Sequence, residues 1–380
     1  MNIETQVIHA GEPRPRISGS VTMPIFQTST YDYAGETEYH DIRYARLSNT
    51  PNHLVLHAKL AALESGEAAL VTASGMAAIS GALLGVLAAG DHFLALDCLY
   101  GGTHSLVTKD LPGLDISHTW IDGHDREAWE RRLRPNTKAI YVETLTNPLL
   151  QIPDLRGIVD FAKAKGLVSI IDNTFASPVN FRPLEIGFDL SVHSATKYLN
   201  GHNDLIAGAV IGSAELVGRI KQLLDHLGGS LDPHACFLLH RGLKTLVLRV
   251  RHQAASAGRI AEFLEAHPSV AAVNYPGLPS HDQHDLAREL LDGYGGMLSF
   301  ELEGDVERAE RFLGRLTIPI VAPSLGGTES LIIRPAAAVH VGLTPEEREA
   351  SGISDALIRF SVGLEAADDL IVDLGQALER

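Results

Sequence analysis

Short apolar runs alternate with segments of helical apolar spacing through most of this 380-residue chain. Runs bounded by polar residues, Gly or Pro predict buried strands, whereas apolar residues three and four positions apart predict amphipathic helices. In the first two thirds of the chain this pattern predicts strands at 68–73, 93–97, 116–121, 139–143, 168–172 and 209–211, mostly separated by helices. Strands that alternate with helices indicate a doubly wound, mostly parallel sheet of the α/β class.

The chain is too long for one ordinary domain, and its pattern changes twice. Residues 1–50 are rich in Pro, Ser and Thr and have little periodicity, so we predict an extended, irregular N-terminal arm. Residues 51–240 are expected to form a large domain. A Gly/Pro break at 227–234 precedes one or two long helices over 235–266. Residues 241–380 are expected to form a smaller α/β domain with strands at 270–274, 297–302, 330–333 and 358–361.

Polar residues gather directly after two of the apolar stretches. Asp172 ends one, and the segment HSATK follows the next at residues 193–197. Open α/β sheets bind ligands at the carboxyl edge of their strands. There, Lys197 can form a Schiff base with a carbonyl, Asp172 can keep a pyridine nitrogen protonated, and the hydroxyls of Ser194 and Thr196 can hold a phosphate. These are the demands of pyridoxal 5'-phosphate. On these residues alone, an Asp172–Lys197 salt bridge beside two turn hydroxyls is an equal alternative.

Three other strand ends carry candidate ligand-binding residues. Ser74 and Gly75 open a helix rich in small residues. The first amides of a helix have no internal partner and suit a phosphate, although an ordinary helix cap explains the same residues equally well. Tyr100, beside two glycines, is either a stacking residue for a flat ring or a core aromatic. Asn147 and Pro148 predict a turn at the end of the 139–143 strand.

Several segments together resemble the cystathionine γ-synthase/γ-lyase family, the pyridoxal-phosphate enzymes of cysteine and methionine metabolism. The resemblance covers nearly the whole chain, and the motifs occur in the family's order. It implies the aspartate-aminotransferase-like fold of type I pyridoxal enzymes, with a mostly parallel central sheet, a smaller C-terminal α/β domain and an N-terminal arm. The segments are SGMAA at 74–78, IIDNTF at 170–175, SATKYLNGH at 194–202, SLGG at 324–327 and RFSVGLE at 359–365.

The resemblance also implies roles for individual residues. Lys197 would hold the cofactor and move protons, Asp172 would face the pyridine nitrogen, and Tyr100 would stack on the ring and assist catalysis. Further cofactor contacts would come from Tyr44, Arg46, Gly75, Met76, Asn147, Ser194 and Thr196. In the family, the residues that match Tyr44 and Arg46 reach the cofactor phosphate of the neighbouring subunit. We therefore expect a homo-oligomer, a dimer of dimers, with shared active sites.

Two residues of the C-terminal part are candidate substrate contacts. Arg359 lies in an apolar strand, and a buried arginine needs an anionic partner. Its planar guanidinium matches a carboxylate in two hydrogen bonds. The resemblance makes that carboxylate the α-carboxylate of an amino-acid substrate, with Ser324 as a second contact. A structural salt bridge from Arg359 to Glu365 is the alternative.

The resemblance implies elimination or replacement at C–S or C–O bonds. It leaves open which individual activity of the family this chain has. The segments GHND at 201–204 and APSLGG at 322–327 resemble plant and Bacillus γ-synthases, which favours the γ-synthase/γ-lyase group. Methionine γ-lyase, cystathionine β-lyase and O-acylhomoserine sulfhydrylase are the alternatives. Members that cleave methionine typically carry Cys where this chain has Gly102. Several synthases and lyases carry an acid where it has Pro323.

Composition and charge limit the classes of binding partner and the cellular compartments that suit this chain. The chain has 47 acidic and 31 basic residues, a net charge of −16, which argues against non-specific nucleic-acid binding. Its two cysteines, Cys98 and Cys236, have no CxxC spacing and fit a reducing cytosol. The sequence has neither a signal-peptide pattern nor an apolar run of about 20 residues. We expect a cytoplasmic protein without a membrane span.

Two other classes of protein compete with this interpretation. A metalloenzyme would use His193, His202 and Asp204 as ligands, but Lys197 between them is an odd neighbour, and we expect no metal site. A non-catalytic pyridoxal-binding or scaffold protein would have no need of Arg359 to hold a substrate carboxylate.

Overall fold

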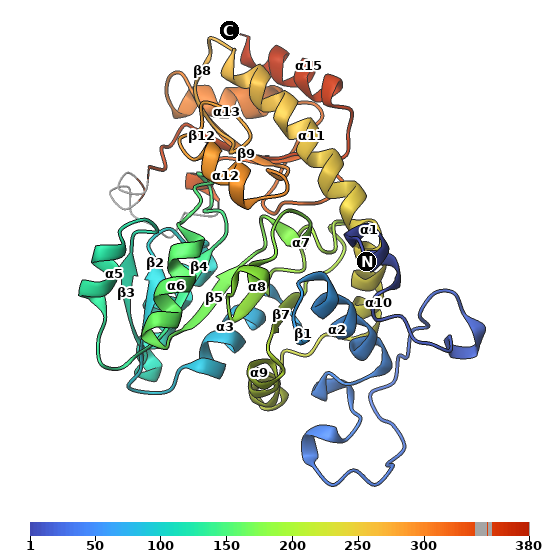
Figure 1. Ribbon diagram of the computed structural model, residues 1–380. Coiled ribbons are helices and arrows are strands. Elements are labelled where there is room, and N and C mark those ends of the chain that lie inside the picture. The colour runs from blue at the N-terminus through green and yellow to red at the C-terminus, as the bar shows by residue number, and fades with distance from the viewer. Residues whose placement is uncertain (339–347, 349–351, 380) are drawn as a thin grey trace.

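The computed structural model describes residues 1–338, 348 and 352–379 and contains two sheets (Figure 1). The larger sheet has seven strands in the order β1-β7-β6-β5-β4-β2-β3. The pairs from β3 to β6 are parallel, and β7 runs antiparallel to both of its neighbours. The α/β class and the mostly parallel sheet are thus confirmed. The strands are β1 Ala68–Thr72, β2 His92–Leu96, β3 Ser117–Ile121, β4 Thr137–Glu143, β5 Val168–Asp172, β6 Leu190–His193 and β7 Gly208–Gly212.

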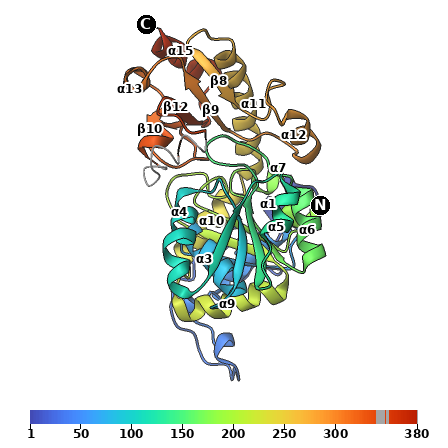
Figure 2. The same ribbon diagram turned by 90° about the vertical axis from the view of Figure 1, so that its left-hand side faces the viewer.

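Helices cover both faces of the large sheet, with α4 on one side and α6 on the other in Figure 2. This cover explains the continuous apolar runs of the parallel strands, which are buried on both faces. Local signals set the helix ends: the Ser74 hydroxyl accepts a 3.0 Å hydrogen bond from the Ala77 amide, and Gly166 ends α6 at a φ of +65°. The helices are α2 Pro51–Leu63, α3 Gly75–Val86, α4 Gly101–Ser105, α5 Arg126–Arg132, α6 Leu155–Lys165, α7 Ser177–Asn180, α8 Pro183–Ile186 and α9 Ala214–Leu227.

The smaller sheet has five strands in the order β10-β11-β12-β9-β8, and only β10 and β11 are parallel. Its strands are β8 Val270–Asn274, β9 Met297–Leu302, β10 Ile320–Val321, β11 Leu331–Ile333 and β12 Leu357–Ser361. Helix α10 Pro233–Leu243 packs in the core of the large sheet, against α2. The helices that accompany the small sheet are α11 Leu246–Glu265, α12 His284–Leu290, α13 Val306–Arg315 and α15 Ala367–Leu378. The one or two long helices predicted over 235–266 are two, α10 and α11.

The long helix α11 joins the two halves. Its first part, through Val250, packs in the core of the large sheet, and its second part, from Ala257, packs in the core of the small sheet. Helix α11 thus contributes side chains to both apolar cores. The domain boundaries near residues 50 and 240 remain predictions.

The N-terminal segment is more ordered than its composition indicates. The prediction of irregular backbone over residues 1–50 is wrong at its start, because Ile3–His9 forms helix α1. Ile3 and Val7 are one helical turn apart, and both pack against the large core, which explains the helix. Beyond α1, the arm contains only one-turn 3-10 helices, at Ile17–Gly19, Tyr39–Asp41 and Ala45–Leu47. In Figure 1 this part of the arm, drawn in blue, extends away from the small sheet.

Within the described residues, no helix combines the length and the apolarity that a membrane span requires.

Candidate active site

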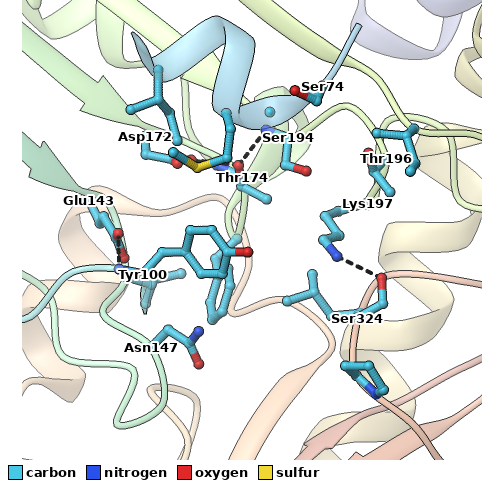
Figure 3. Close-up of a pocket in the computed structure, with 18 of the residues that line it drawn as sticks. Ser74, Tyr100, Glu143, Asn147, Asp172, Thr174, Ser194, Thr196, Lys197 and Ser324 are labelled. Atoms are coloured by element: carbon cyan, nitrogen blue, oxygen red, sulfur yellow. Dashed lines mark hydrogen bonds between the residues drawn. The ribbon is translucent and has the colours of Figure 1, made fainter. Parts of the chain in front are cut away.

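A cavity of about 340 Å³ lies at the carboxyl edge of the large sheet (Figure 3). The large domain lines it with the start of α3, Tyr100 and the residues that follow β4, β5 and β6. The small domain lines it with Pro323, Ser324 and Leu325 from a loop, and with Arg359 from β12. The candidates that follow strands of the large sheet lie together at one edge of that sheet, whereas Ser324 and Arg359 reach the cavity from the small sheet and its loop.

Two carboxyl groups stand side by side at this edge. Glu143 ends β4, Asp172 ends β5, and the two residues are direct partners in the parallel ladder. Burial raises the pKa of both, and the neighbouring Asp172 raises the pKa of Glu143 further, well above its usual range. Thr174 opposes the rise at Asp172, because its amide and its hydroxyl both donate to Oδ1. Asp172 is therefore the member of the pair that is more easily ionised.

Lys197 projects its amine into the cavity from the segment after β6. Its Nζ donates to the Ser324 hydroxyl over 2.7 Å. Burial, and then the nearby Arg359 guanidinium, lower the pKa of Lys197 to about 8. No ion pair joins Lys197 to Asp172 in the described part of the chain, so the structure does not support the simple salt bridge considered above. Lys197 is thus a buried amine whose pKa is lowered toward neutrality and which a hydroxyl holds in place.

Arg359 is 4% exposed and has no carboxylate partner among the described residues. Its guanidinium donates to the Asn147 side-chain oxygen over 3.2 Å and to the Ser324 carbonyl over 3.1 Å. The alternative salt bridge to Glu365 is not formed, because that carboxylate accepts hydrogen bonds from the amide and hydroxyl of Ser330. A buried cation that has only neutral partners and faces a cavity is prepared for an external anion.

Ser324 connects the two cations of the cavity, since its hydroxyl accepts from Lys197 and its carbonyl accepts from Arg359. Its φ of +95° is outside the regions that a residue with a side chain ordinarily adopts. Backbone strain of this kind is concentrated at functional sites.

The start of α3 and the segment after β6 form a second, uncharged side of the cavity. The amides of Gly75 and Met76 precede the first hydrogen bond of the helix, from Ala78 to Ser74. Gly75 is required there, because a Cβ atom would lie 2.8 Å from the Cβ of Ser194. The hydroxyl of Thr196 is already engaged with the backbone of Ala207.

Tyr100 lies beside the cavity and is 42% exposed, so it is not a core aromatic. Its amide donates to the Glu143 carboxyl over 2.6 Å, which ties the tyrosine to the carboxyl pair. Gly102 makes room for the phenol, because a Cβ atom at this position would lie 2.5 Å from the Tyr100 ring. A residue larger than glycine here would force the ring to move.

Two predicted residues and one predicted cluster lie elsewhere. Tyr44 and Arg46 do not line the cavity of their own chain; Arg46 instead donates to the carbonyl of Asp225. The proposed metal ligands do not converge either. His193 pairs with Glu64, His202 contacts the Asn200 carbonyl and Asp204 accepts from the Asn200 side chain. In the described ranges, no group of three His, Cys, Asp or Glu side chains is placed to hold a metal ion.

Sequence reasoning missed Glu143 and Thr174. Glu143 ends a buried apolar run just as Asp172 does, so the same argument about strand ends would have found it. Thr174 gave no such signal, because its role depends on contacts that form only in the folded chain. Its hydroxyl donates to Asp172 and accepts a 2.8 Å hydrogen bond from the Ser194 amide.

Comparison with known proteins assigns the chain to a family. A family model described as Cys/Met metabolism PLP-dependent enzyme matches residues 4–379. The chain belongs to this family. The cystathionine gamma-lyase of Bacillus subtilis (strain 168) is 45% identical over 381 residues, with 100% of both chains covered. The L-methionine gamma-lyase of Fusobacterium nucleatum subsp. polymorphum is 42% identical, with 99% of this chain and 98% of the relative covered.

A solved structure supports the same assignment. The crystal structure of cystathionine gamma-lyase from Lactobacillus plantarum complexed with L-serine superposes with a TM-score of 0.93 at 39% identity. The match covers 99% of this chain and 98% of that one. As a member of the family, the protein is a pyridoxal-phosphate-dependent enzyme of sulfur amino-acid metabolism. The expectations for family, type I fold and cofactor are confirmed.

The cavity fits this cofactor. It presents one buried amine of lowered pKa, one hydrogen-bonded carboxylate and a helix start whose amides are free for a phosphate. A side chain at Gly75 would fill the space beside these amides. These groups line one cavity, and their chemistry suits the aldehyde, the ring nitrogen and the phosphate of pyridoxal phosphate.

Proposed function

We propose that the protein eliminates or replaces the β- or γ-substituent of a sulfur-containing or O-acylated amino acid, as a γ-synthase/γ-lyase-type enzyme. The observation that carries this proposal is Arg359, a buried guanidinium without a carboxylate partner that faces the same cavity as the Lys197 amine. A protein that only bound pyridoxal phosphate would have no use for this second cation. Ser324 is hydrogen-bonded to both Lys197 and Arg359, and this arrangement suits an amino acid whose carboxylate is held by Arg359 beside the Lys197 amine.

In this mechanism, Lys197 would hold the cofactor covalently, Asp172 would face its ring nitrogen and Tyr100 would cover the ring. Asn147 would contact the ring oxygen through its amide nitrogen, since its oxygen is engaged with Arg359. The amides of Gly75 and Met76 and the hydroxyl of Ser194 would hold the phosphate, joined by the hydroxyl of Thr196 once it turns from the Ala207 carbonyl. When bound, the cofactor supplies a ring that accepts the electron pair released at the substrate's α-carbon.

The remaining steps are proton transfers and positioning by the protein. Arg359 binds the substrate carboxylate in two hydrogen bonds, with Ser324 beside it. Once the substrate's amine has displaced Lys197 from the cofactor, the freed Lys197 amine would remove the α-proton. Its pKa, lowered to about 8, leaves part of it neutral near physiological pH. Tyr100 is placed to assist the departure of the side-chain substituent.

One feature of the cavity supports the γ-synthase/γ-lyase type over methionine γ-lyase. At Gly102 a side chain would collide with the Tyr100 ring, so the cysteine typical of methionine-cleaving members would need a different ring position. Pro323, beside Ser324, counts the other way, because several synthases and lyases carry at that position an acid that could bind the distal amine of cystathionine. The similarity of whole chains does not discriminate, since relatives named for each activity are about equally identical.

A substrate panel tests this choice. We expect turnover of cystathionine, or of an O-acylhomoserine with cysteine, to exceed turnover of methionine by at least about tenfold, the scale of discrimination that one changed pocket group provides. Product analysis separates cleavage at the β-carbon from cleavage at the γ-carbon. Methionine as the best substrate would overturn the assignment.

The two free cysteines, neither of them in a disulfide, support a cytoplasmic site of action.

We also propose that the active site is shared between subunits of a homo-oligomer, a dimer of dimers. The cations that line the described cavity are Lys197 and Arg359, which this proposal assigns to the cofactor aldehyde and to the substrate carboxylate, so neither is left for the phosphate. A phosphate dianion among neutral donors favours a guanidinium. Arg46 is half-buried in the arm and does not line the cavity of its own chain, which supports a role for it in the site of a second copy.

A mixed dimer tests this arrangement. We expect a hybrid of Arg46→Ala and Lys197→Ala subunits to recover about half of the wild-type activity, because crossed arms put both lesions into one site and leave the other intact. The measurement is turnover of hybrids separated by two different affinity tags. A hybrid as inactive as its parents, with dimer formation confirmed, would show that each arm serves its own chain.

A further inference from the structure

Asp225 is an acid in an unfavourable position on helix α9. It is the third residue from the C-terminal end, and its side chain is 2% exposed. The C-terminus of a helix carries partial negative charge, which disfavours a carboxylate. A buried acid persists at such a place only when positive groups compensate for it. The residues that surround Asp225 therefore indicate why it is there.

Two basic side chains contact this carboxylate, one from α9 and one from the arm, and a third, from the arm, contacts the main chain of the same residue. Lys221, one turn earlier in α9, lies 2.7 Å from Oδ2. His40 Nδ1 lies 2.8 Å from the same oxygen. The Arg46 guanidinium donates to the Asp225 main-chain carbonyl and, over 2.6 Å, to the Tyr39 hydroxyl. Asp225 thus binds the arm through its side chain and through its backbone.

Aromatic contacts strengthen the same attachment. The Tyr39 ring stacks on His226, with the ring centres 6.0 Å apart and the planes 17° from parallel. His40 meets His226 edge to face at 5.3 Å. The guanidinium of Arg46 lies 5.9 Å from the centre of the Tyr39 ring. Residues 39–46 are therefore attached to the end of α9 at several points.

The end of α9 is a rigid support. The helix packs closely on α3, where a Cβ atom at Gly81 or Gly85 would lie within 3 Å of Leu224 or Ile220, respectively. Just after α9, the Gly229 carbonyl accepts a 2.6 Å hydrogen bond from Ala73, the residue before the Ser74 cap. A group mounted on such an element is positioned more precisely than one on a free loop.

We infer that Asp225 is a positioning residue that fixes Arg46 for the cofactor phosphate of a second copy of this chain. The inference rests on the shared active site proposed above. Two N–H groups of Arg46 are engaged with the main-chain carbonyl of Asp225 and the hydroxyl of Tyr39, and the others stay available for an anion. The Asp225 carboxylate acts on Arg46 indirectly, because it binds His40, the neighbour of Tyr39. Because the guanidinium is ordered before the phosphate binds, less conformational entropy is lost on binding.

Titration of the cofactor-free enzyme with pyridoxal phosphate tests the inference, with the dissociation constant read from the cofactor's absorbance. We expect Arg46→Ala to weaken binding about 100-fold and Asp225→Asn about tenfold, the scale of charge-assisted hydrogen bonds. In the Arg46→Ala background, Asp225→Asn should have no further effect, because a positioning residue acts only through the group that it positions. Glu215→Gln removes an exposed carboxylate from the same helix and should change affinity less than twofold.

His40→Gln provides a second variant, in which Asp225 keeps its partner Lys221 and the helix keeps its charge balance. It should weaken binding about threefold and increase amide hydrogen exchange over residues 39–47. An unchanged affinity in both Asp225→Asn and His40→Gln would overturn the inference, as would an equal loss from Asp225→Asn with and without Arg46. An unchanged affinity in Arg46→Ala would instead overturn the proposed role of the arm.

Discussion

Replacing Lys197 with alanine is expected to lower kcat/KM at least about 10⁴-fold, because one residue both attaches the cofactor and transfers the α-proton. The Lys197 amine is buried, hydrogen-bonded to Ser324 and close to Arg359. Among the described residues, no second lysine lines the cavity, so none can take over its role. Added methylamine should restore a small part of the activity by supplying a free amine in the space that the side chain leaves.

Borohydride reduction of the wild-type enzyme gives an independent readout. Mass mapping should place the reduced cofactor on Lys197 alone, and a label on another lysine would contradict the assignment. In the cofactor-free enzyme, only the neutral amine attacks the cofactor aldehyde. Since the pKa of Lys197 is lowered to about 8, the rate of cofactor incorporation should rise with pH and level off above about 8.

Replacing Asp172 with asparagine is expected to reduce α-proton exchange and turnover together, by roughly 10³-fold, because the positive ring nitrogen loses its charged partner. The fold should be retained, since the amide has nearly the same shape and its oxygen still accepts the two hydrogen bonds from Thr174. Proton exchange at the α-carbon, followed by mass spectrometry in deuterated water, measures the effect without requiring product release.

Glu143→Gln is the matched control for this prediction. It makes the same carboxyl-to-amide change in the neighbouring strand and keeps an acceptor for the Tyr100 amide. Burial and the adjacent Asp172 raise the pKa of Glu143 well above its usual range, so little charge is lost in this variant. We expect a loss below about tenfold. Near-normal exchange in Asp172→Asn, or equal losses in the two variants, would show that Asp172 is not the partner of the ring nitrogen.

The local pattern of the chain was sufficient for the fold class and for most of the candidate site. Strands buried on both faces need continuous apolar runs, and this demand is visible within five or six residues. A charged or hydroxyl residue directly after such a run stands out for the same reason. Asp172, Lys197 and the Ser74–Gly75 helix start were therefore found from the sequence, and several ordered motifs identified the family.

Contacts between distant segments were decided only by the tertiary structure. The register of β4 and β5 brings Glu143 beside Asp172 and creates a pair of unequal acidity. Arg359 meets Asn147 across 212 positions of sequence, and Lys197 meets Ser324 across 127. Nothing in the local pattern indicates that Asp225 binds the arm, because α9 has an ordinary amphipathic sequence. Periodicity records which face of an element is buried, whereas the identity of the side chain across from it depends on how separate elements pack.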